Sequence, residues 1–428
     1  MRPEGELKAQ HGVIVRRHRP DYLVLLYMGL LMLLGLVVIY AIGPQRANVL
    51  NNAYGSDYSD SYFFLKQVVS IGAALAAFAV TALVPKDLFV RIGPAVFITG
   101  LLACLLLAIA SFGGWAIAQE ALGATRWFNL GPLSFQPAEL LKFGLLLYLG
   151  GFLGIRSRQG KINDLHQTII PAVVLLALSL LFIVVLQRDL GTGIAMTAIA
   201  FAMIFMAGIN KKTMLIALAV AVGVGILFVL SAPHRIERVM TFFQGDSASI
   251  DSEGGYHIQH AKIAIGSGGL FGVGIGNSVQ ATGYLPEAIN DSVFAIIGEV
   301  FGFVGLMALL ALFMGLLLRM LKIMDHTVDI EYKLIVAGVF GWFGAHVILN
   351  IAAMIGIFPL TGITLPLLSF GGTSMMFIAA ALGLVFQISR HTIHSSRLSH
   401  KEAQSENSLS RRGVGRTRHT SRRSTSGN

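Results

Sequence analysis

The sequence predicts an all-α polytopic membrane protein with about ten transmembrane helices. Three observations lead to this fold class. The chain of 428 residues is 55% hydrophobic and only 13% charged. Its apolar residues gather in runs of about 20, the length that a helix needs to cross the hydrocarbon core of a bilayer. Because a spanning segment must satisfy its own backbone polar groups, these continuous apolar runs favour helices.

Ten spans follow in order along the chain. The first 21 residues are charged and lack a small-residue cleavage site, so the apolar run that follows is an uncleaved anchor. The fifth and sixth spans require a sharp reversal near Gln187–Thr192, where charge interrupts the apolar pattern. The predicted spans cover residues 22–43, 62–84, 90–112, 136–155, 168–187, 190–208, 213–231, 292–318, 334–357 and 367–389.

Basic residues predict the orientation. With the N-terminus inside, 24 of the 32 Lys and Arg residues fall in cytoplasmic segments, as the positive-inside rule requires. Both termini are therefore expected in the cytoplasm, with a cytoplasmic segment at 1–21, a transmembrane domain at 22–390 and a disordered basic tail at 391–428. Residues 113–135 are expected outside, and residues 232–291 form a long extracytoplasmic loop between the seventh and eighth spans.

The net charge of +10 does not indicate nucleic acid as a partner, because it resides mostly on the tails. Residues 391–428 carry eight Lys or Arg against two Glu, with many Ser and no apolar periodicity. Anionic membrane lipids of the inner leaflet attract such a segment, although positive-inside retention explains it equally well. The only cysteine, Cys104, excludes an internal disulfide and a cysteine metal site.

The 60-residue loop 232–291 is far longer than the usual connection, and loops of this length are commonly functional. Within it, residues 266–276 contain six glycines. Their backbone N–H groups can cradle a phosphate, or their missing side chains can allow close packing of segments. Arg235, Arg238 and Lys262 are basic residues outside, against the topology rule, so either an anionic diphosphate or nearby acids are expected to hold them.

Three acids mark the entry to the eighth span. Glu287 and Asp291 lie at its mouth, and Glu299 lies eight residues further, about 12 Å deeper on a regular helix. Acids at such depth are costly and commonly functional. A plain alternative stays open for Asp291, because it or a neighbouring residue would suit the N-cap of the span. Glu299 is expected to line a cavity or to pair with a cation, for which the candidates are Lys66, Lys142 and Arg126.

Other polar residues fall inside or beside the spans. Glu139 and Lys142 are three residues apart, so a helix places them on one face, as a salt bridge requires. Asp189 directly follows an arginine and cannot face it, so the two are expected to meet different partners. His346 and Asn350 are spaced i, i+4 and are expected to hydrogen-bond to neighbouring helices.

Five motifs occur in order between residues 20 and 390. They are Gly123-Ala-Thr-Arg126-Trp127 with Phe135-Gln136-Pro137-Ala138-Glu139-Leu-Leu-Lys142, Gln187-Arg-Asp189-Leu-Gly191-Thr192, Ala264-Ile-Gly-Ser-Gly-Gly-Leu-Phe-Gly272, Leu285-Pro-Glu287 with Asp291, and Pro359-Leu-Thr361-Gly362-Ile-Thr-Leu365-Pro366-Leu-Leu-Ser369-Phe-Gly371-Gly372. Together they resemble the motifs of the SEDS family of shape, elongation, division and sporulation proteins, which includes FtsW and RodA. The resemblance covers nearly the whole predicted membrane region.

The resemblance implies a peptidoglycan glycosyltransferase that polymerises lipid II at the outer face of the cytoplasmic membrane. Asp291 matches the essential acid of the family, with the expected role of general base or metal-assisted activator of the acceptor hydroxyl. A divalent cation, Mg²⁺ or Mn²⁺, bound by Asp291 and the substrate diphosphate is implied. The other residues expected to bind substrate or to support the site are Glu287, Arg126, Arg235, Arg238, Lys142, Glu139, Gln136, Asp189 and Ser369.

The family also implies partners. Its members work with a class B penicillin-binding protein, here an FtsI-like transpeptidase, and with other divisome proteins. The segment Leu130–Gln136 and the basic tails resemble FtsW more than RodA, which implies a multi-pass protein at the division septum. The chain departs from the family at Arg188, where Pro is usual, and at Val300, where a second Glu often follows Glu299. The missing acid argues against a paired-acid role for Glu299.

Two other functions remain open. One is a lipid II flippase that uses the same acids as a substrate or proton path, and the other is a non-catalytic scaffold for division proteins. Broken helices with acids at the membrane midplane would favour transport. The acids and the long loop are expected at the outer face of this chain, which favours chemistry there.

Overall fold

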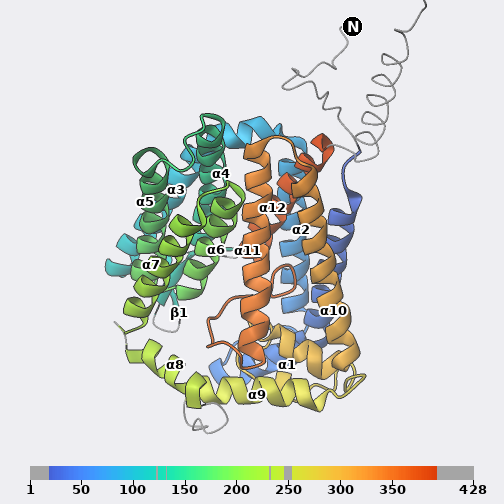
Figure 1. Cartoon of the computed structure of the whole chain (residues 1–428). Coiled ribbons are helices and arrows are strands. Elements are labelled where there is room, and N and C mark those ends of the chain that lie inside the picture. The colour runs from blue at the N-terminus through green and yellow to red at the C-terminus, as the bar shows by residue number, and fades with distance from the viewer. Residues whose placement is uncertain (1–18, 122–123, 132, 231–232, 245–252, 393–428) are drawn as a thin grey trace, which may run out of the picture.

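Long apolar helices make up most of the chain (Figure 1). The computed structural model describes residues 19–121, 124–131, 133–230, 233–244 and 253–392. Most of the expected cytoplasmic segment 1–21 and nearly all of the tail 391–428 therefore lie outside the described residues.

Every predicted span overlaps a helical segment. The ten segments are α1 (Tyr22–Tyr54), α2 (Tyr62–Leu83), α3 (Lys86–Phe112), α4 (Pro137–Arg158), α5 (Ile170–Leu180) with its flanking π-helical turns η1 (Leu165–Ile169) and η2 (Leu181–Leu186), α6 (Leu190–Met206), α7 (Lys211–Leu230), α10 (Val293–His326), α11 (Ile330–Met354) and α12 (Gly372–Ile388). Within the described chain, eight of these are long and apolar enough to cross a membrane, and α6 is a shorter apolar helix.

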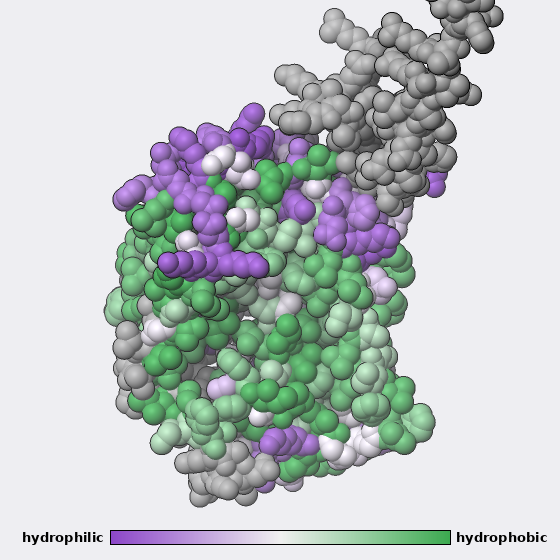
Figure 2. All heavy atoms as spheres, in the orientation of Figure 1, coloured by the Kyte–Doolittle hydropathy of each residue, from purple (hydrophilic) through white to green (hydrophobic). Residues whose placement is uncertain are grey.

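The two ends of the described chain lie together. The backbone N–H of Asp21 donates to Ser389 Oγ at 2.8 Å, and Arg319 Nε lies 2.5 Å from Asp21 Oδ2. Figure 1 shows this terminal end at the top and β1, α8 and α9 at the opposite end, called here the loop end. Hydrophilic residues gather at the terminal end above a broad apolar belt (Figure 2), the surface expected of a helix bundle embedded in lipid.

Residues 113–135, predicted as an outside segment between spans, are the exception to the helical fold. They contain three antiparallel strands, β1 (Ala118–Ala121), β2 (Ala124–Leu130) and β3 (Leu133–Phe135), in the order β1-β2-β3. Thr, Trp and Phe in β2 suit a pleated, half-buried surface, and Phe128 faces Phe135 across the β2–β3 pair. Thr373 Oγ1 donates to Ser134 O at 2.7 Å, which attaches the sheet to the start of α12.

The segment 232–291, predicted as a loop, contains two further helices, α8 (Pro233–Gln244) and α9 (Glu253–Ser267), and a short 3₁₀ turn, η4 (Gln280–Thr282). Its glycine run packs against a break in α10 at Gly302, where φ is 67° and ψ is −164°. The N–H of Val273 donates to Glu299 O at 2.9 Å, and the N–H of Phe303 donates to Gly269 O at 2.9 Å. These bonds favour close packing over a phosphate cradle.

The last predicted span begins too early. Residues 355–371 are irregular, and α12 starts only at Gly372. Pro359 and Pro366 lack the N–H that a helix needs, and Gly362 has a left-handed φ of 67°. This segment, called the 355–371 connection, lies at the loop end and forms one wall of the site described next.

Candidate active site

Asp291 is held where three segments meet at the loop end. The amide of Asn350, on α11, donates to Asp291 O at 2.6 Å and to Ile363 O at 2.7 Å. A methyl group on Gly362 would stand 3.9 Å from Asp291 Oδ2, an ordinary contact distance, so this glycine lies directly beside the carboxylate. The N–H of Phe370 donates to Ile289 O at 2.8 Å. The entry to α10 is thus joined to α11 and to the 355–371 connection.

Asp291 does not cap α10. The N-cap position belongs to Ser292, which makes no side-chain capping bond. Its hydroxyl instead donates to Pro286 O at 2.8 Å and lies 2.6 Å from His257 Nε2, on α9. The N-cap therefore falls on Ser292, a neighbouring residue that the capping alternative allowed, and His257 is a neighbour of the site that the sequence did not indicate.

Glu287 lies at the mouth of α10, as expected, and is a local anchor. Its Oε1 is 3.8 Å from Arg46 Nη2, and its Oε2 accepts a hydrogen bond from the side chain of Asn290. Its φ of 49° is left-handed, a conformation that costs an L-residue about 1–2 kcal/mol. The predicted first span ends at residue 43, three residues before Arg46, whereas α1 continues to Tyr54 and contains it, so the sequence did not place Arg46 near the acids.

The expected cation partners of Glu299 are wrong. Its carboxylate is 1% exposed and accepts hydrogen bonds from Ser278 Oγ at 2.5 Å and from the N–H groups of Val279 and Gln280 at 2.9 and 3.2 Å. These donors belong to the start of η4, so Glu299 caps a turn of the long loop. The break at Gly302 follows it by three residues and ends the regular helix on which the prediction relied.

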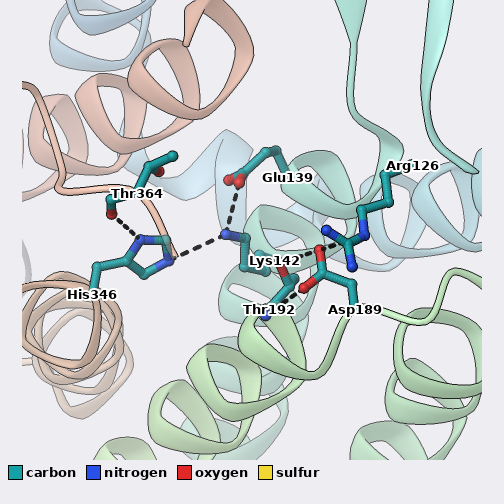
Figure 3. Close-up of polar contacts among 7 residues, drawn as sticks. All are labelled: Arg126, Glu139, Lys142, Asp189, Thr192, His346 and Thr364. Carbon is teal, nitrogen blue, oxygen red and sulfur yellow. Dashed lines mark hydrogen bonds and ion pairs between the residues drawn. The ribbon is translucent and has the colours of Figure 1, made fainter. Parts of the chain in front are cut away.

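Glu139 and Lys142 form the predicted salt bridge, with 2.8 Å between Oε1 and Nζ (Figure 3). Their exposed fractions are 3% and 0%, so the pair is enclosed by protein. Lys142 Nζ also lies 3.4 Å from His346 Nε2 and 4.9 Å from the centre of the Trp342 ring. His346 Nδ1 is 3.2 Å from Thr364 O, so His346 reaches the 355–371 connection and not only a neighbouring helix.

Arg126 and Asp189 join the sheet to the bundle. Arg126, on β2, donates from Nη2 to Arg188 O at 2.9 Å, and its Nε is 4.0 Å from Asp189 Oδ2. Asp189 caps α6 by accepting from the N–H and Oγ1 of Thr192 at 3.0 and 2.9 Å. Figure 3 shows this group beside the buried ion pair. Both residues therefore have structural partners within the described chain.

The remaining predicted site residues are dispersed. Gln136 stands at the N-cap position of α4, and the buried Ser369 accepts a hydrogen bond from the N–H of Leu365 at 2.8 Å. Arg235 and Arg238 lie on α8, but their side chains are outside the described part of the structure. Lys66, on α2, lies with its Nζ 5.8 Å from the centre of the Phe370 ring, which brings a further cation to this side of the site.

Known proteins of one family are similar to this chain in sequence. A family model described as "cell cycle protein", covering FtsW, RodA and SpoVE, matches residues 21–394. Stage V sporulation protein E of Bacillus subtilis is 30% identical and aligns with 88% of this chain and 99% of its own length. The probable peptidoglycan glycosyltransferase FtsW of Aromatoleum aromaticum is 33% identical, with 84% and 85% covered.

Solved structures resemble the fold. A chain of a peptidoglycan synthase complex, described as coordinating polymerization and crosslinking, superposes with a TM-score of 0.67 at 26% identity, covering 87% of this chain and 98% of that one. The rod shape determining protein RodA of Thermus thermophilus superposes with a TM-score of 0.59 at 24% identity, covering 88% and 98%.

Proposed function

The chain belongs to the family of cell cycle proteins that includes FtsW, RodA and SpoVE, and from this premise we infer that it is a membrane-embedded peptidoglycan glycosyltransferase. The observation that carries the proposal is the placement of Asp291. It is the acid of the family's motif, and its backbone is held between α11 and the 355–371 connection at the end of the bundle remote from both described chain ends.

Asp291 is proposed as the general base of lipid II polymerisation. Its carboxylate accepts the proton of the acceptor sugar's 4-hydroxyl as that oxygen attacks the anomeric carbon of the donor glycan. The undecaprenyl diphosphate leaves from the opposite side, so the new linkage is inverted. A positioned carboxylate of this kind contributes typically 10²–10⁴-fold to a rate. Gly362 lies beside Asp291 Oδ2 and has no side chain, so it adds no bulk next to the carboxylate.

A divalent cation, Mg²⁺ or Mn²⁺, is part of the proposal. Among the described residues no group of three His, Cys, Asp or Glu side chains stands ready to hold a metal. Mg²⁺ is commonly bound by one or two carboxylates together with substrate phosphates and water. Asp291 supplies one carboxylate, and Thr361, which directly precedes Gly362 in the chain, has a buried Oγ1 without a hydrogen-bond partner. A bound ion would supply charge stabilisation for the departing diphosphate.

The test is polymerisation by the purified full-length protein in proteoliposomes, with fluorescent lipid II and Mg²⁺ or Mn²⁺. We expect Asp291→Asn to lower the rate at least 100-fold while the protein remains folded. The matched control is Asp60→Asn, which makes the same change on an exposed carboxylate between α1 and α2. An Asp291→Asn variant that polymerises at the wild-type rate would contradict the assignment.

Flipping of lipid II is the second candidate function. The break in α10 is the kind of interrupted helix that transporters use. In this chain the break is filled by the backbone of the glycine run, and Glu299 is committed to η4. We therefore favour polymerisation. A reconstituted protein that moves lipid II between leaflets but forms no glycan, with or without its partner, would favour the transporter.

We also propose a class B penicillin-binding protein as partner and the division septum as location. A chain of similar fold occurs in a peptidoglycan synthase complex, and several curated relatives are named FtsW. Co-purification with an FtsI-like transpeptidase and fluorescence imaging of the tagged chain test these two points. A label spread evenly along the cylinder of dividing cells would exclude the septal assignment.

A further inference from the structure

One face of α11 carries three residues that bear on the site. Trp342, His346 and Asn350 are spaced four apart, so they form one stripe along the helix. All three are buried. Trp342 contacts the ammonium of Lys142, and His346 contacts both Lys142 and Thr364. Asn350 contacts both Asp291 and Ile363. No role in the proposed reaction accounts for this stripe.

Asn350 clamps two distant segments. Its amide nitrogen donates to Asp291 O at 2.6 Å and to Ile363 O at 2.7 Å, so both N–H bonds of one nitrogen are used. The partners lie 59 and 13 residues away in sequence. With an exposed fraction of 1%, Asn350 is sealed from solvent and from substrate. Only a group with two donors on one planar nitrogen serves both carbonyls in this way.

The contacts of His346 define its hydrogen positions. The ammonium of Lys142 has only donors, so Nε2 must accept from it, and the carbonyl of Thr364 has only lone pairs, so Nδ1 must carry the proton. His346 is therefore neutral and bridges a cation and a carbonyl. Thr364 directly follows Ile363, so His346 and Asn350 hold adjacent residues of the 355–371 connection from one helix face.

We propose that His346 and Asn350 are positioning residues through which the buried Glu139–Lys142 ion pair sets the location of the Asp291 backbone. Glu139 and Lys142 are 3% and 0% exposed, which favours the supporting role among the two that the sequence allowed. Lys142 orients His346. His346 and Asn350 then hold the 355–371 connection in place by hydrogen bonds, and Asn350 also bonds to the main chain of Asp291. The inference rests on the proposed role of Asp291.

Three variants and one control test the proposal in the polymerisation assay. Asn350→Leu keeps the volume and removes both donors. His346→Gln keeps an acceptor for Lys142 and a donor for Thr364, whereas His346→Leu keeps neither. Thr81→Val is the matched control, because it removes a buried bond from α2 to Ala380 O on α12, at a different helix contact.

We expect Asn350→Leu and His346→Leu to lower kcat about 10- to 100-fold with KM within about twofold of wild type, since a small misplacement of a catalytic group costs up to about 10²-fold. His346→Gln should recover most of the loss, and Thr81→Val should leave kcat unchanged. Wild-type kcat in either leucine variant, a loss confined to KM, or a His346→Gln variant as poor as His346→Leu would overturn the proposal.

Hydrogen exchange separates this inference from the proposed function. If Asn350 is a clamp, Asn350→Leu raises amide exchange in residues 286–294 and 361–371, whether or not the wild-type protein polymerises lipid II. If the wild-type protein is inactive but amide exchange increases in the variant, the proposed function is contradicted and the clamp is supported. If the wild-type protein is active but amide exchange is unchanged in both segments of the variant, only the clamp is contradicted.

Discussion

The Glu139–Lys142 pair provides a quantitative test of how the bundle core is held. Lys142 is fully buried, and its ammonium finds one carboxylate oxygen at 2.8 Å. The other oxygen of Glu139, Oε2, is buried without a hydrogen-bond partner. Each charge therefore depends almost wholly on the other. We consider the single variants Glu139→Gln and Lys142→Met and the double variant that contains both.

The magnitude follows from the cost of an orphaned charge. Breaking a buried pair by removing one partner costs about 3–5 kcal/mol. The double variant contains neither charge and loses mainly the hydrogen bond to His346, worth about 1–2 kcal/mol. The coupling energy between the two sites should therefore be at least about 3 kcal/mol.

Equilibrium unfolding in mixed detergent micelles measures the three variants against wild type. Each single variant should be less stable than the double variant, and the two single losses should sum to far more than the double loss. Additive losses, or single variants that each lose less than about 1 kcal/mol, would refute the view that the two charges are mutually dependent. Polymerisation rates of the same proteins show whether stability and activity fall together.

Three further outcomes follow from the structure. Gly302→Ala should abolish the peak of folded protein on size-exclusion chromatography, because the φ of Gly302 is left-handed and the new methyl would meet backbone atoms of the glycine run. Gly266→Ala is the control and should be tolerated, because the space around Gly266 is open. Glu299→Gln should destabilise by about 1–3 kcal/mol in the unfolding assay and keep its turnover number, since its carboxylate only caps a turn. Arg126→Ala should lower polymerisation several-fold by releasing β2 from the start of α6, and unchanged activity at normal expression would exclude that linkage.

The helices were predictable because the bilayer imposes their pattern. A span must be continuous, apolar and about 20 residues long, so composition alone locates it. The Glu139–Lys142 bridge was also predictable, because an i, i+3 pair depends only on helix geometry. In both cases the physical cause lies within a few turns of the residues concerned.

The sheet and the break in α10 were not predictable for the opposite reason. Strands of four, seven and three residues give too short an alternation to distinguish from a polar loop. Gly302 sits in an apolar run where glycine is common in membrane helices. The helix breaks there because the backbone groups of residues 299–304 form hydrogen bonds with the backbone of Gly269–Gly274 instead of with the next helical turn. That partner segment lies well before α10 in the sequence.

Glu299 and Asp291 show why a residue type alone does not reveal its use. Both are acids at the entry of one apolar helix, eight residues apart. The Glu299 carboxylate accepts hydrogen bonds from a hydroxyl and two backbone N–H groups, which commit it to the start of η4. At Asp291 the backbone carbonyl receives the strong amide bond from Asn350, while the carboxylate lies beside a glycine. The role proposed for Asp291 requires a main chain that is held in place, and the residue that holds it, Asn350, is 59 positions away.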